Sequence, residues 1–178
     1  MKYNITFLAL FLVNGAFSQN YHRSWTIQKN SKKERIALII ANNDYIGDND
    51  LKKPIQSSIK AKSVLSKNGF DVLQAHDLRR ADMVNVLNEF SNKYENYKMA
   101  MILYMGHGVS IDGTNYVIPI DAKPVPKDKM PFETIIPMDY VIKKFNNPKI
   151  PKIIVFVACR NNPLPKEATR SWQKTRSV

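Results

Sequence analysis

The sequence predicts a single α/β domain built on a mainly parallel β-sheet with helices on both faces. The chain has 178 residues, 44% of them hydrophobic, and a chain of this length buries enough surface to form one core without a disulfide or a structural metal. Apolar runs of strand length alternate with segments of helical periodicity, and strands that alternate with helices need crossover connections, which make the strands parallel. The 6 glycines and the single cysteine exclude collagen-like and disulfide-rich classes.

The first half of the domain predicts strand, helix, strand, helix and strand, in that order. The continuous apolar run 35–41 has the length of a strand buried on both faces. Pro54 suits the first position of the helix that follows, and Gly69 suits its C-terminal stop. The residues expected on the buried face of this helix are Ile55, Ile59, Val64 and Leu65. The later elements are a strand over 70–75, a helix over 82–96 and a strand over 99–105.

The second half predicts a short surface hairpin, a loop, a short helix and a last strand. Asp112 and Gly113 separate two β-prone segments, and this dipeptide favours a tight hairpin because both turn positions tolerate positive φ. Segment 122–131 holds three prolines and three lysines and predicts a loop. Residues 138–145 predict a short helix, and 152–158 predict a fourth buried strand.

The first 18 residues predict a secretory signal peptide. Lys2 precedes an apolar run over 5–13, and the small residues before and at Ser18 suit cleavage after that residue. A retained membrane anchor is the weaker alternative, because a membrane-spanning helix needs about twenty apolar residues. We therefore expect an exported protein, periplasmic or extracellular, with no membrane span in the mature form. Residues 19–34 predict a flexible lead-in, and 166–178 a mobile basic tail.

Two predicted strands end in residues that can do covalent chemistry. His107, between two glycines, follows the strand 99–105, and Cys159 follows the strand 152–158. If the two strands are neighbours, both residues lie on the edge of the sheet where open parallel sheets bind ligands. An imidazole can then accept the thiol proton, and the amides of Gly108 and Cys159 can donate to an oxyanion. Taken singly, each residue is more often structural, but their separation of 52 positions matches the spacing of about 50 found in caspases.

Five segments together resemble the caspase-like cysteine peptidases of bacteria, which are relatives of caspases and metacaspases. They are 39–45 (Ile-Ile-Ala-Asn-Asn-Asp-Tyr), 68–72 (Asn-Gly-Phe-Asp-Val), 104–108 (Tyr-Met-Gly-His-Gly), 115–122 (Asn-Tyr-Val-Ile-Pro-Ile-Asp-Ala) and 158–163 (Ala-Cys-Arg-Asn-Asn-Pro). The resemblance covers residues 35 to about 165 and implies a caspase-like three-layer sandwich. It also implies His107 as general base, Cys159 as nucleophile, and the amides of Gly108 and Cys159 as the oxyanion hole. The expected function is that of an exported cysteine-type endopeptidase that acts on peptides or proteins through an acyl-enzyme.

The chain departs from the family pattern at several places. Val157 stands where metacaspase-like members usually have an acidic residue, Ser57 and Ser58 stand near the place of an Asp-Ala pair, and no arginine lies between Ala41 and Lys60. We therefore assign no cleavage preference. Only 19 residues follow Cys159, so the resemblance is to the large catalytic subunit, and we expect an apolar sheet edge that a partner chain, a second copy or a downstream segment covers. The alternative is a catalytically inactive caspase-fold interaction module.

The remaining sequence features do not favour a cofactor, a metal or a nucleic acid. The three histidines, His22, His76 and His107, have no zinc-site spacing, and the glycines form no dinucleotide-binding pattern. The formal charge of +12 creates a long-range potential that could attract nucleic acid. The lysines and arginines are spread along the chain without interleaved aromatic residues, so a solvated surface is favoured over a nucleic-acid-binding domain, which is the third and weakest alternative.

Overall fold

The computed structural model describes residues 26–28, 34–46, 50–111, 113–123 and 134–158, and of residues 26–28 the backbone alone. The predicted signal peptide, most of the predicted loop 122–131, the nucleophile candidate Cys159 and the predicted tail 166–178 lie outside the described residues. The boundaries predicted for the signal peptide, the lead-in, the catalytic domain and the tail therefore remain predictions.

The core of the fold is a five-stranded sheet in the order β1-β3-β2-β4-β8. Its strands are β1 (Thr26–Gln28), β2 (Arg35–Ala41), β3 (Phe70–His76), β4 (Met99–Met105) and β8 (Lys152–Val157). The four longer strands are parallel, and β1 pairs antiparallel with β3. The predicted mainly parallel sheet is confirmed. Sequence patterning did not predict β1, which lies within the segment 19–34.

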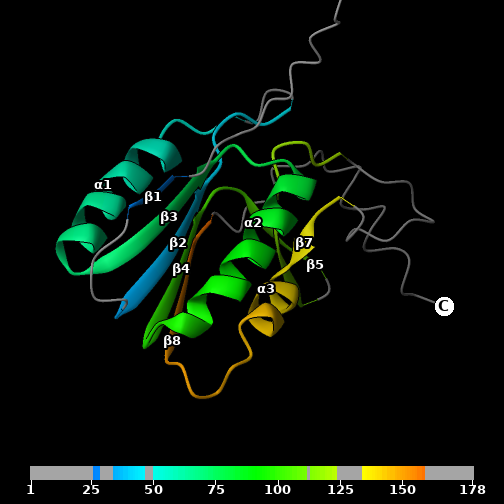
Figure 1. The fold of residues 1–178 in the computed structure, drawn as a ribbon. Coiled ribbons are helices and arrows are strands. Elements are labelled where there is room, and N and C mark those ends of the chain that lie inside the picture. The colour runs from blue at the N-terminus through cyan, green and yellow to red at the C-terminus, as the bar shows by residue number, and fades with distance from the viewer. Residues whose placement is uncertain (1–25, 29–33, 47–49, 112, 124–133, 159–178) are drawn as a thin grey trace, which may run out of the picture.

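Helices cover both faces of this sheet and make three layers (Figure 1). On one face α1 (Pro54–Lys67) packs over the side chains that β2 directs there, Ala37, Ile39 and Ala41. On the other face α2 (Arg80–Lys93), the short 3₁₀ turn η1 (Tyr94–Asn96) and α3 (Met138–Lys144) pack over the alternate side chains of the same strand, Ile36, Leu38 and Ile40. Because both faces of β2 are buried, the strand is apolar at nearly every position.

The predicted buried face of α1 is partly wrong. Ile55 and Leu65 pack against the sheet, but Ile59 and Val64 are 55% and 59% exposed. A helix turns through about 100° per residue, so the buried stripe centred on Ser58 passes beside both of these positions. Ser58 itself is fully buried, which a pattern of apolar residues alone cannot reveal.

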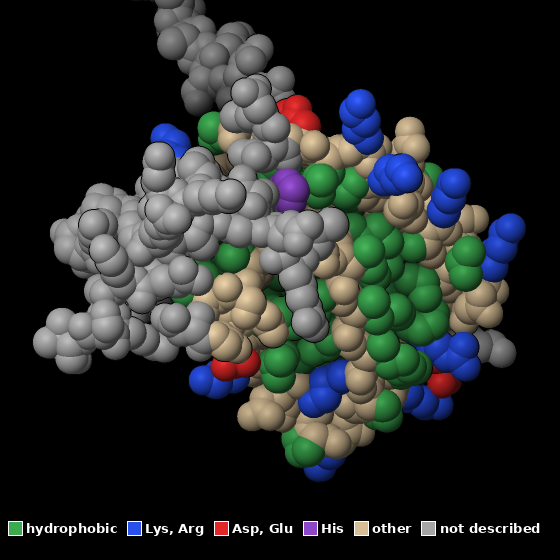
Figure 2. All heavy atoms as spheres, turned by 180° about the vertical axis from the view of Figure 1, so that it is seen from behind, with side chains coloured by type: hydrophobic (Ala, Val, Ile, Leu, Met, Phe, Trp, Pro, Cys, Tyr) green, Lys and Arg blue, Asp and Glu red, His purple; other side chains and the backbone are tan. Residues whose placement is uncertain are grey.

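The last strand, β8, is also less buried than predicted. Among the described strands it pairs with β4 alone and forms one edge of the sheet. Ile153 and Val157 on β8 are 42% and 56% exposed. The expectation of an apolar sheet edge is therefore met in the described part of the chain. Figure 2, which views the side turned away in Figure 1, shows a broad hydrophobic area with lysines and arginines scattered around it.

The predicted hairpin belongs to a second, antiparallel sheet of three strands. These are β5 (Gly108–Ile111), β6 (Thr114–Val117) and β7 (Ile136–Pro137), in the order β5-β6-β7. Gly113 in the turn has a φ of 79°, the conformation for which glycine is favoured. The hairpin is less superficial than predicted, because Val109 and Ile111 are buried in a small core with Tyr45.

A buried polar cluster joins α1 to the end of β3. Ser58 Oγ lies 2.7 Å from the carbonyl oxygen of Ile55 and 2.9 Å from His76 Nε2, and Gln74 Nε2 donates to the same hydroxyl oxygen at 2.9 Å. A hydroxyl has one hydrogen and two lone pairs, so the cluster is satisfied when Ser58 donates to Ile55 and accepts from Gln74 and His76. Burial lowers the pKa of His76.

The lowered pKa of His76 makes the stability of the fold depend on pH. The unfolded chain takes up the proton near pH 6.5, whereas the folded chain resists it until a lower pH, so the free energy of unfolding decreases as the pH falls through this window. Urea unfolding between pH 8 and pH 5 measures the slope. In His76→Gln, which can still donate to Ser58, we expect a shallower slope.

Ser110→Ala, at an exposed position, serves as a control, and we expect its pH slope to equal that of the wild type. If His76→Gln has the slope of the wild type, groups other than His76 set the pH dependence.

Candidate active site

The ends of β4 and β8 form one continuous rim. The two strands are neighbours in level register, with Met105 opposite Val157, and the Gly106 amide donates to the carbonyl oxygen of Val157 at 3.3 Å. The condition on which the predicted dyad depends, that the two strands are adjacent, is therefore met. His107 follows this rim directly, and Cys159, two positions beyond Val157, lies outside the described residues.

The residue before Cys159 lies against the start of β5. A Cβ atom placed on Gly108 would be 3.0 Å from Cβ of Ala158 and 3.2 Å from the carbonyl oxygen of Tyr116. A side chain at position 108 would therefore push the hairpin away from the end of β8. Glycine at this position lets the two segments approach closely.

The backbone amide of Gly108 points away from the hairpin. The Ile118 amide donates to the carbonyl oxygen of His107 at 3.1 Å, so a bond of the ladder joins positions 107 and 118. Gly108 lies opposite Val117 in the next pair, and antiparallel ladders alternate between hydrogen-bonded and non-hydrogen-bonded pairs. The Gly108 N–H is therefore directed to the outer edge of β5 and not toward β6.

The backbone and side chain of His107 are held by two tyrosines. Its amide donates to the hydroxyl oxygen of Tyr45 at 2.8 Å, and its carbonyl oxygen accepts from the hydroxyl of Tyr104 at 2.8 Å. The imidazole ring packs on the ring of Tyr45, with centroids 4.5 Å apart and an interplanar angle of 53°. The two tyrosines thus contact the backbone of the half-buried His107, and Tyr45 also contacts its ring.

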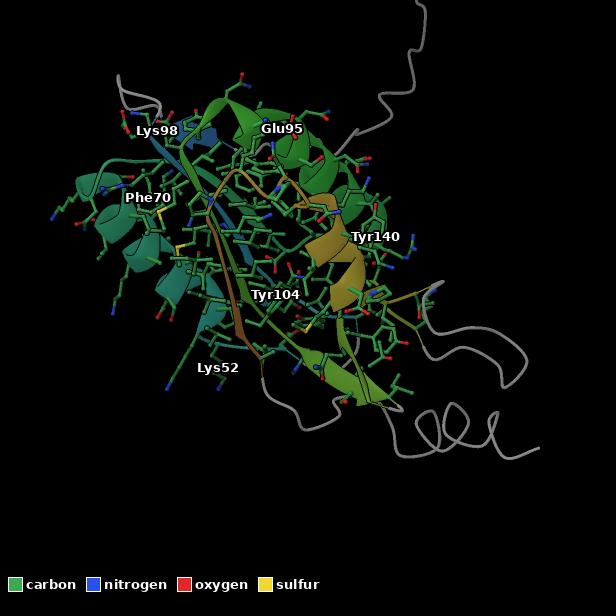
Figure 3. All side chains as sticks on the ribbon, turned by 90° about the horizontal axis from the view of Figure 1, so that it is seen from below. Lys52, Phe70, Glu95, Lys98, Tyr104 and Tyr140 are labelled. Carbon is green, nitrogen blue, oxygen red and sulfur yellow. The ribbon has the colours of Figure 1, made fainter. Side chains whose placement is uncertain are left out.

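The two tyrosine hydroxyls form a small buried polar centre beneath the rim. Their oxygens are 3.5 Å apart, and the hydroxyl of Tyr104 is also 3.0 Å from the carbonyl oxygen of Ile118. Burial raises the pKa of Tyr45, and it raises that of Tyr104 well above the ordinary value. Both hydroxyls are therefore neutral at physiological pH. Tyr104 extends from β4 into the layer between the sheet and α3 (Figure 3).

The loop that carries Tyr45 is fixed by side chains at the ends of β2 and β3. Buried Asn42 accepts from the Leu78 amide at 3.0 Å, and the Asp77 carboxylate accepts from the amides of residues 43 and 44 at 2.7 and 2.9 Å. Asp77 adopts a left-handed φ of 48°, which Asp tolerates better than most residues. The amide of Tyr45 donates to the Asp50 carboxylate at 2.9 Å. These bonds hold Tyr45 in place under His107.

A cavity of about 160 Å³ lies next to the rim. It lies between the hairpin, the start of α3 and the end of β8, and Gly108, Met138, Phe156 and Ala158 contribute to its walls. An engineered cavity of roughly 150 Å³ holds a benzene molecule, so this space has the size of one aliphatic or aromatic side chain.

The described ranges contain neither a metal cluster nor a membrane-spanning helix. Over these residues, no group of three or more His, Cys, Asp and Glu side chains is placed to hold a metal ion. No helix in the same ranges is both long and apolar enough to cross a bilayer. Ser57, one of the residues that depart from the family pattern, is exposed on α1, while the adjacent Ser58 belongs to the buried cluster with His76.

Of the predicted site residues, His107 and Gly108 lie together at the rim, and Cys159 is outside the described residues. No role for Tyr45 or Tyr104 was predicted from the sequence. Both lie within segments that carry the family resemblance, and Tyr104 precedes His107 by three positions. The presence of a tyrosine in each of these two segments was the available signal, but only the fold shows that the two hydroxyl oxygens lie 3.5 Å apart.

Comparison with known proteins identifies the family of this domain. Residues 34–177 match the family model described as the caspase domain of peptidase family C14. Rat caspase-1 is 24% identical over 164 residues, which are 88% of this chain and 39% of the relative. The human mucosa-associated lymphoid tissue lymphoma translocation protein 1 is 29% identical over 90 residues, 51% of this chain and 11% of the relative. The chain therefore spans well under half the length of these relatives.

Solved structures share the fold at lower sequence identity. The Drosophila initiator caspase Dronc aligns with a TM-score of 0.59 and 17% identity, covering 72% of this chain and 50% of that chain. This likeness confirms the predicted caspase-like three-layer α/β sandwich. At this identity it is evidence for the fold alone.

Gly106 is the residue whose replacement tests the polar centre under the rim. A Cβ atom at this position would lie 2.6 Å from the hydroxyl oxygens of both Tyr45 and Tyr104, so both buried side chains must move. We expect Gly106→Ala to lower the free energy of unfolding by about 2 kcal/mol, as overpacking does. Urea denaturation measures the loss.

A double variant separates this clash from a general effect on the backbone. Combining Gly106→Ala with Tyr45→Phe removes one of the two oxygens that the new Cβ would meet. We therefore expect the double variant to lose less stability than the sum of the losses of the two single variants. Strict additivity of the two single variants would contradict the clash.

Proposed function

Because the chain belongs to the caspase domain family, we propose that it is an exported cysteine-type endopeptidase whose Cys159 and His107 hydrolyse peptide bonds in protein substrates. The main supporting observation is the level pairing of β4 with β8, together with the bond from the Gly106 amide to Val157. Chain connectivity then limits the distance between the two residues, because Cys159 is only two positions beyond Val157, a span of at most about 7 Å.

The proposed reaction passes through an acyl-enzyme. His107 accepts the thiol proton as the Cys159 sulfur attacks the peptide carbonyl carbon, and the C–N bond breaks as His107 returns that proton to the leaving amine. His107 then takes a proton from water, whose oxygen attacks the thioester carbonyl. Collapse releases the carboxylic product, and the sulfur recovers its proton from His107.

The position of Gly108 supports its proposed role in binding the oxyanion. Its N–H is directed to the outer edge of β5, and its Cα lies beside Ala158, the residue before the nucleophile. An amide donor that is already oriented stabilises developing negative charge without reorganisation. The amide of Cys159 is proposed as the second donor.

The proposal also includes a strand or segment that completes the sheet on β8. The exposed fractions of Ile153 and Val157, and the position of β8 at the sheet edge in the described part of the chain, support this. A partner chain, a second copy of this chain or a further segment would each supply the missing backbone pairing.

Export is proposed from the N-terminal sequence. When the chain is expressed with residues 1–18 in a secreting bacterium, we expect the intact mass of the exported protein to correspond to a start at Gln19. Leu10→Arg interrupts the apolar run, so this variant should accumulate as the uncleaved precursor inside the cell. Recovery of the wild type only as a full-length chain in the cytoplasm would contradict export.

Thiol labelling tests the catalytic proposal. A peptide-like electrophilic probe at neutral pH should modify Cys159, and in His107→Gln the labelling rate should fall by a factor of about 100 or more, as removal of a general base does. Cys159→Ser should not be labelled. His76→Gln is the matched control, because it removes a histidine that lies in the cluster under α1, and it should label at the wild-type rate.

The same assay tests the completion of the sheet. If a second copy is needed, the rate per chain should rise with protein concentration, and Ile153→Asp, at the exposed edge strand, should abolish that rise. Slow labelling that is indifferent to His107 at every concentration would contradict the peptidase proposal for this chain.

A further inference from the structure

We propose that Tyr45 is the positioning residue of His107: its hydroxyl anchors the His107 backbone, and its ring limits the rotation of the imidazole. This inference rests on the proposed function for its catalytic consequence. Tyr45 acts through His107, and nothing requires it to touch the substrate.

Two contacts reach His107 from this one side chain. The His107 amide donates to Tyr45 Oη at 2.8 Å, and the two rings pack with centroids 4.5 Å apart. The hydrogen bond fixes the position of the His107 backbone, and the ring contact limits the rotation of the imidazole. A single backbone bond would leave the rotation of the side chain free.

The position of His107 between two glycines makes an external anchor necessary. Glycine lacks a Cβ and samples more backbone conformations than any other residue, so Gly106 and Gly108 give His107 little local rigidity. Both glycines are required for close packing, Gly106 by the tyrosine hydroxyls and Gly108 by Ala158. The stiffness of the segment must therefore come from contacts with other elements.

Tyr45 is itself rigid enough to serve as that anchor. It is 6% exposed and packs in the core of the small sheet. Its amide is bound by Asp50, and the amide of the following Ile46 donates to the carbonyl oxygen of Ile120 at 2.9 Å. Hydrogen bonds therefore hold the peptide groups before and after Tyr45.

The hydrogen bonds of the two tyrosines are mutually consistent. Tyr45 Oη accepts from His107, and its own hydrogen can go to Tyr104 Oη, 3.5 Å away. Tyr104 can then donate to the carbonyl oxygen of His107 or to that of Ile118. Because each hydroxyl has one hydrogen and two lone pairs, the amide and carbonyl of His107 can both be bound at once.

The consequence for catalysis follows from the two proton transfers that His107 has to make. The imidazole must face the Cys159 thiol first and the leaving amine afterwards, without a large reorientation. Misplacement of a reacting group by about 1 Å can reduce a rate by a factor of about 100. An imidazole held by Tyr45 retains the required geometry.

The test compares Tyr45→Phe and Tyr45→Leu with Tyr97→Phe. Tyr97 is a matched control because its hydroxyl donates to Asp71 at 2.6 Å near the opposite ends of the strands. We expect the maximal rate of Cys159 labelling at saturating probe to fall about tenfold in Tyr45→Phe and about 100-fold in Tyr45→Leu, with unchanged half-saturating probe concentration. Tyr97→Phe should label at the wild-type rate.

NMR of the same variants separates positioning from activity. In Tyr45→Phe, the His107 amide should exchange with deuterium faster, and in Tyr45→Leu the χ1 couplings of His107 should average over several rotamers. If neither measurement changes in folded variants, the positioning proposal is wrong whether or not the protein is active. If both change but wild-type labelling never depends on His107, the positioning proposal stands and the proposed function fails.

Unchanged labelling in a folded Tyr45→Leu variant, or an equal decrease in Tyr97→Phe, would overturn the catalytic consequence. Circular dichroism confirms folding before each assay. Tyr45→Phe keeps the ring, so the test remains decisive if Tyr45→Leu does not fold.

Discussion

The level pairing of β4 with β8 is the constraint on which the candidate site depends. Parallel pairing aligns the carboxyl ends of the two strands, and the bond from Gly106 to Val157 continues this alignment one residue beyond β4. A shift of β8 by one residue would reverse the face of every one of its side chains. The proximity of the two strand ends is therefore a property of the sheet, and the loops that follow only need to be short.

Buried polar side chains hold the ends of the strands where a regular ladder no longer can. Asn42 and Asp77 bind backbone amides of the loops next to them, and the hydroxyls of Tyr45 and Tyr104 bind both the amide and the carbonyl of His107. Unbonded backbone groups are costly in a buried setting, so these side chains permit irregular backbone at the rim. The same bonds give the rim a definite shape, which chemistry at that position requires.

The centre of the five-stranded sheet and its edge at β8 differ in how completely they are covered. The center of the sheet, at β2, is buried by α1 on one face and by α2 with α3 on the other, while β8 leaves Ile153 and Val157 exposed. Lys152 on β8 nevertheless binds the carbonyl oxygens of Phe145 and Asn147 at 2.6 and 2.8 Å. This ammonium ties the connection after α3 to the start of β8, so the edge strand is anchored by its own side chain as well as by β4.

The sequence by itself determined the elements whose signals are local. The apolar run of β2, the start of α1 at Pro54 and the turn at Gly113 depend on residues a few positions apart, and all three were predicted. The same holds for His107 and Gly108 at the end of a strand. Their position follows from alternation of strands and helices, which short-range patterns express.

Tertiary structure alone decided which surfaces are buried and which distant residues meet. The buried face of α1 includes Ser58, whose hydroxyl oxygen accepts from Gln74 on β3, and it omits Ile59. The exposure of β8 depends on what lies beside it, which its own apolar sequence does not record. Tyr45 is 62 positions from His107, and only the packing of the small sheet against the central one brings its hydroxyl to the His107 amide. Contacts of this length depend on the whole fold, because no local preference of the chain specifies them.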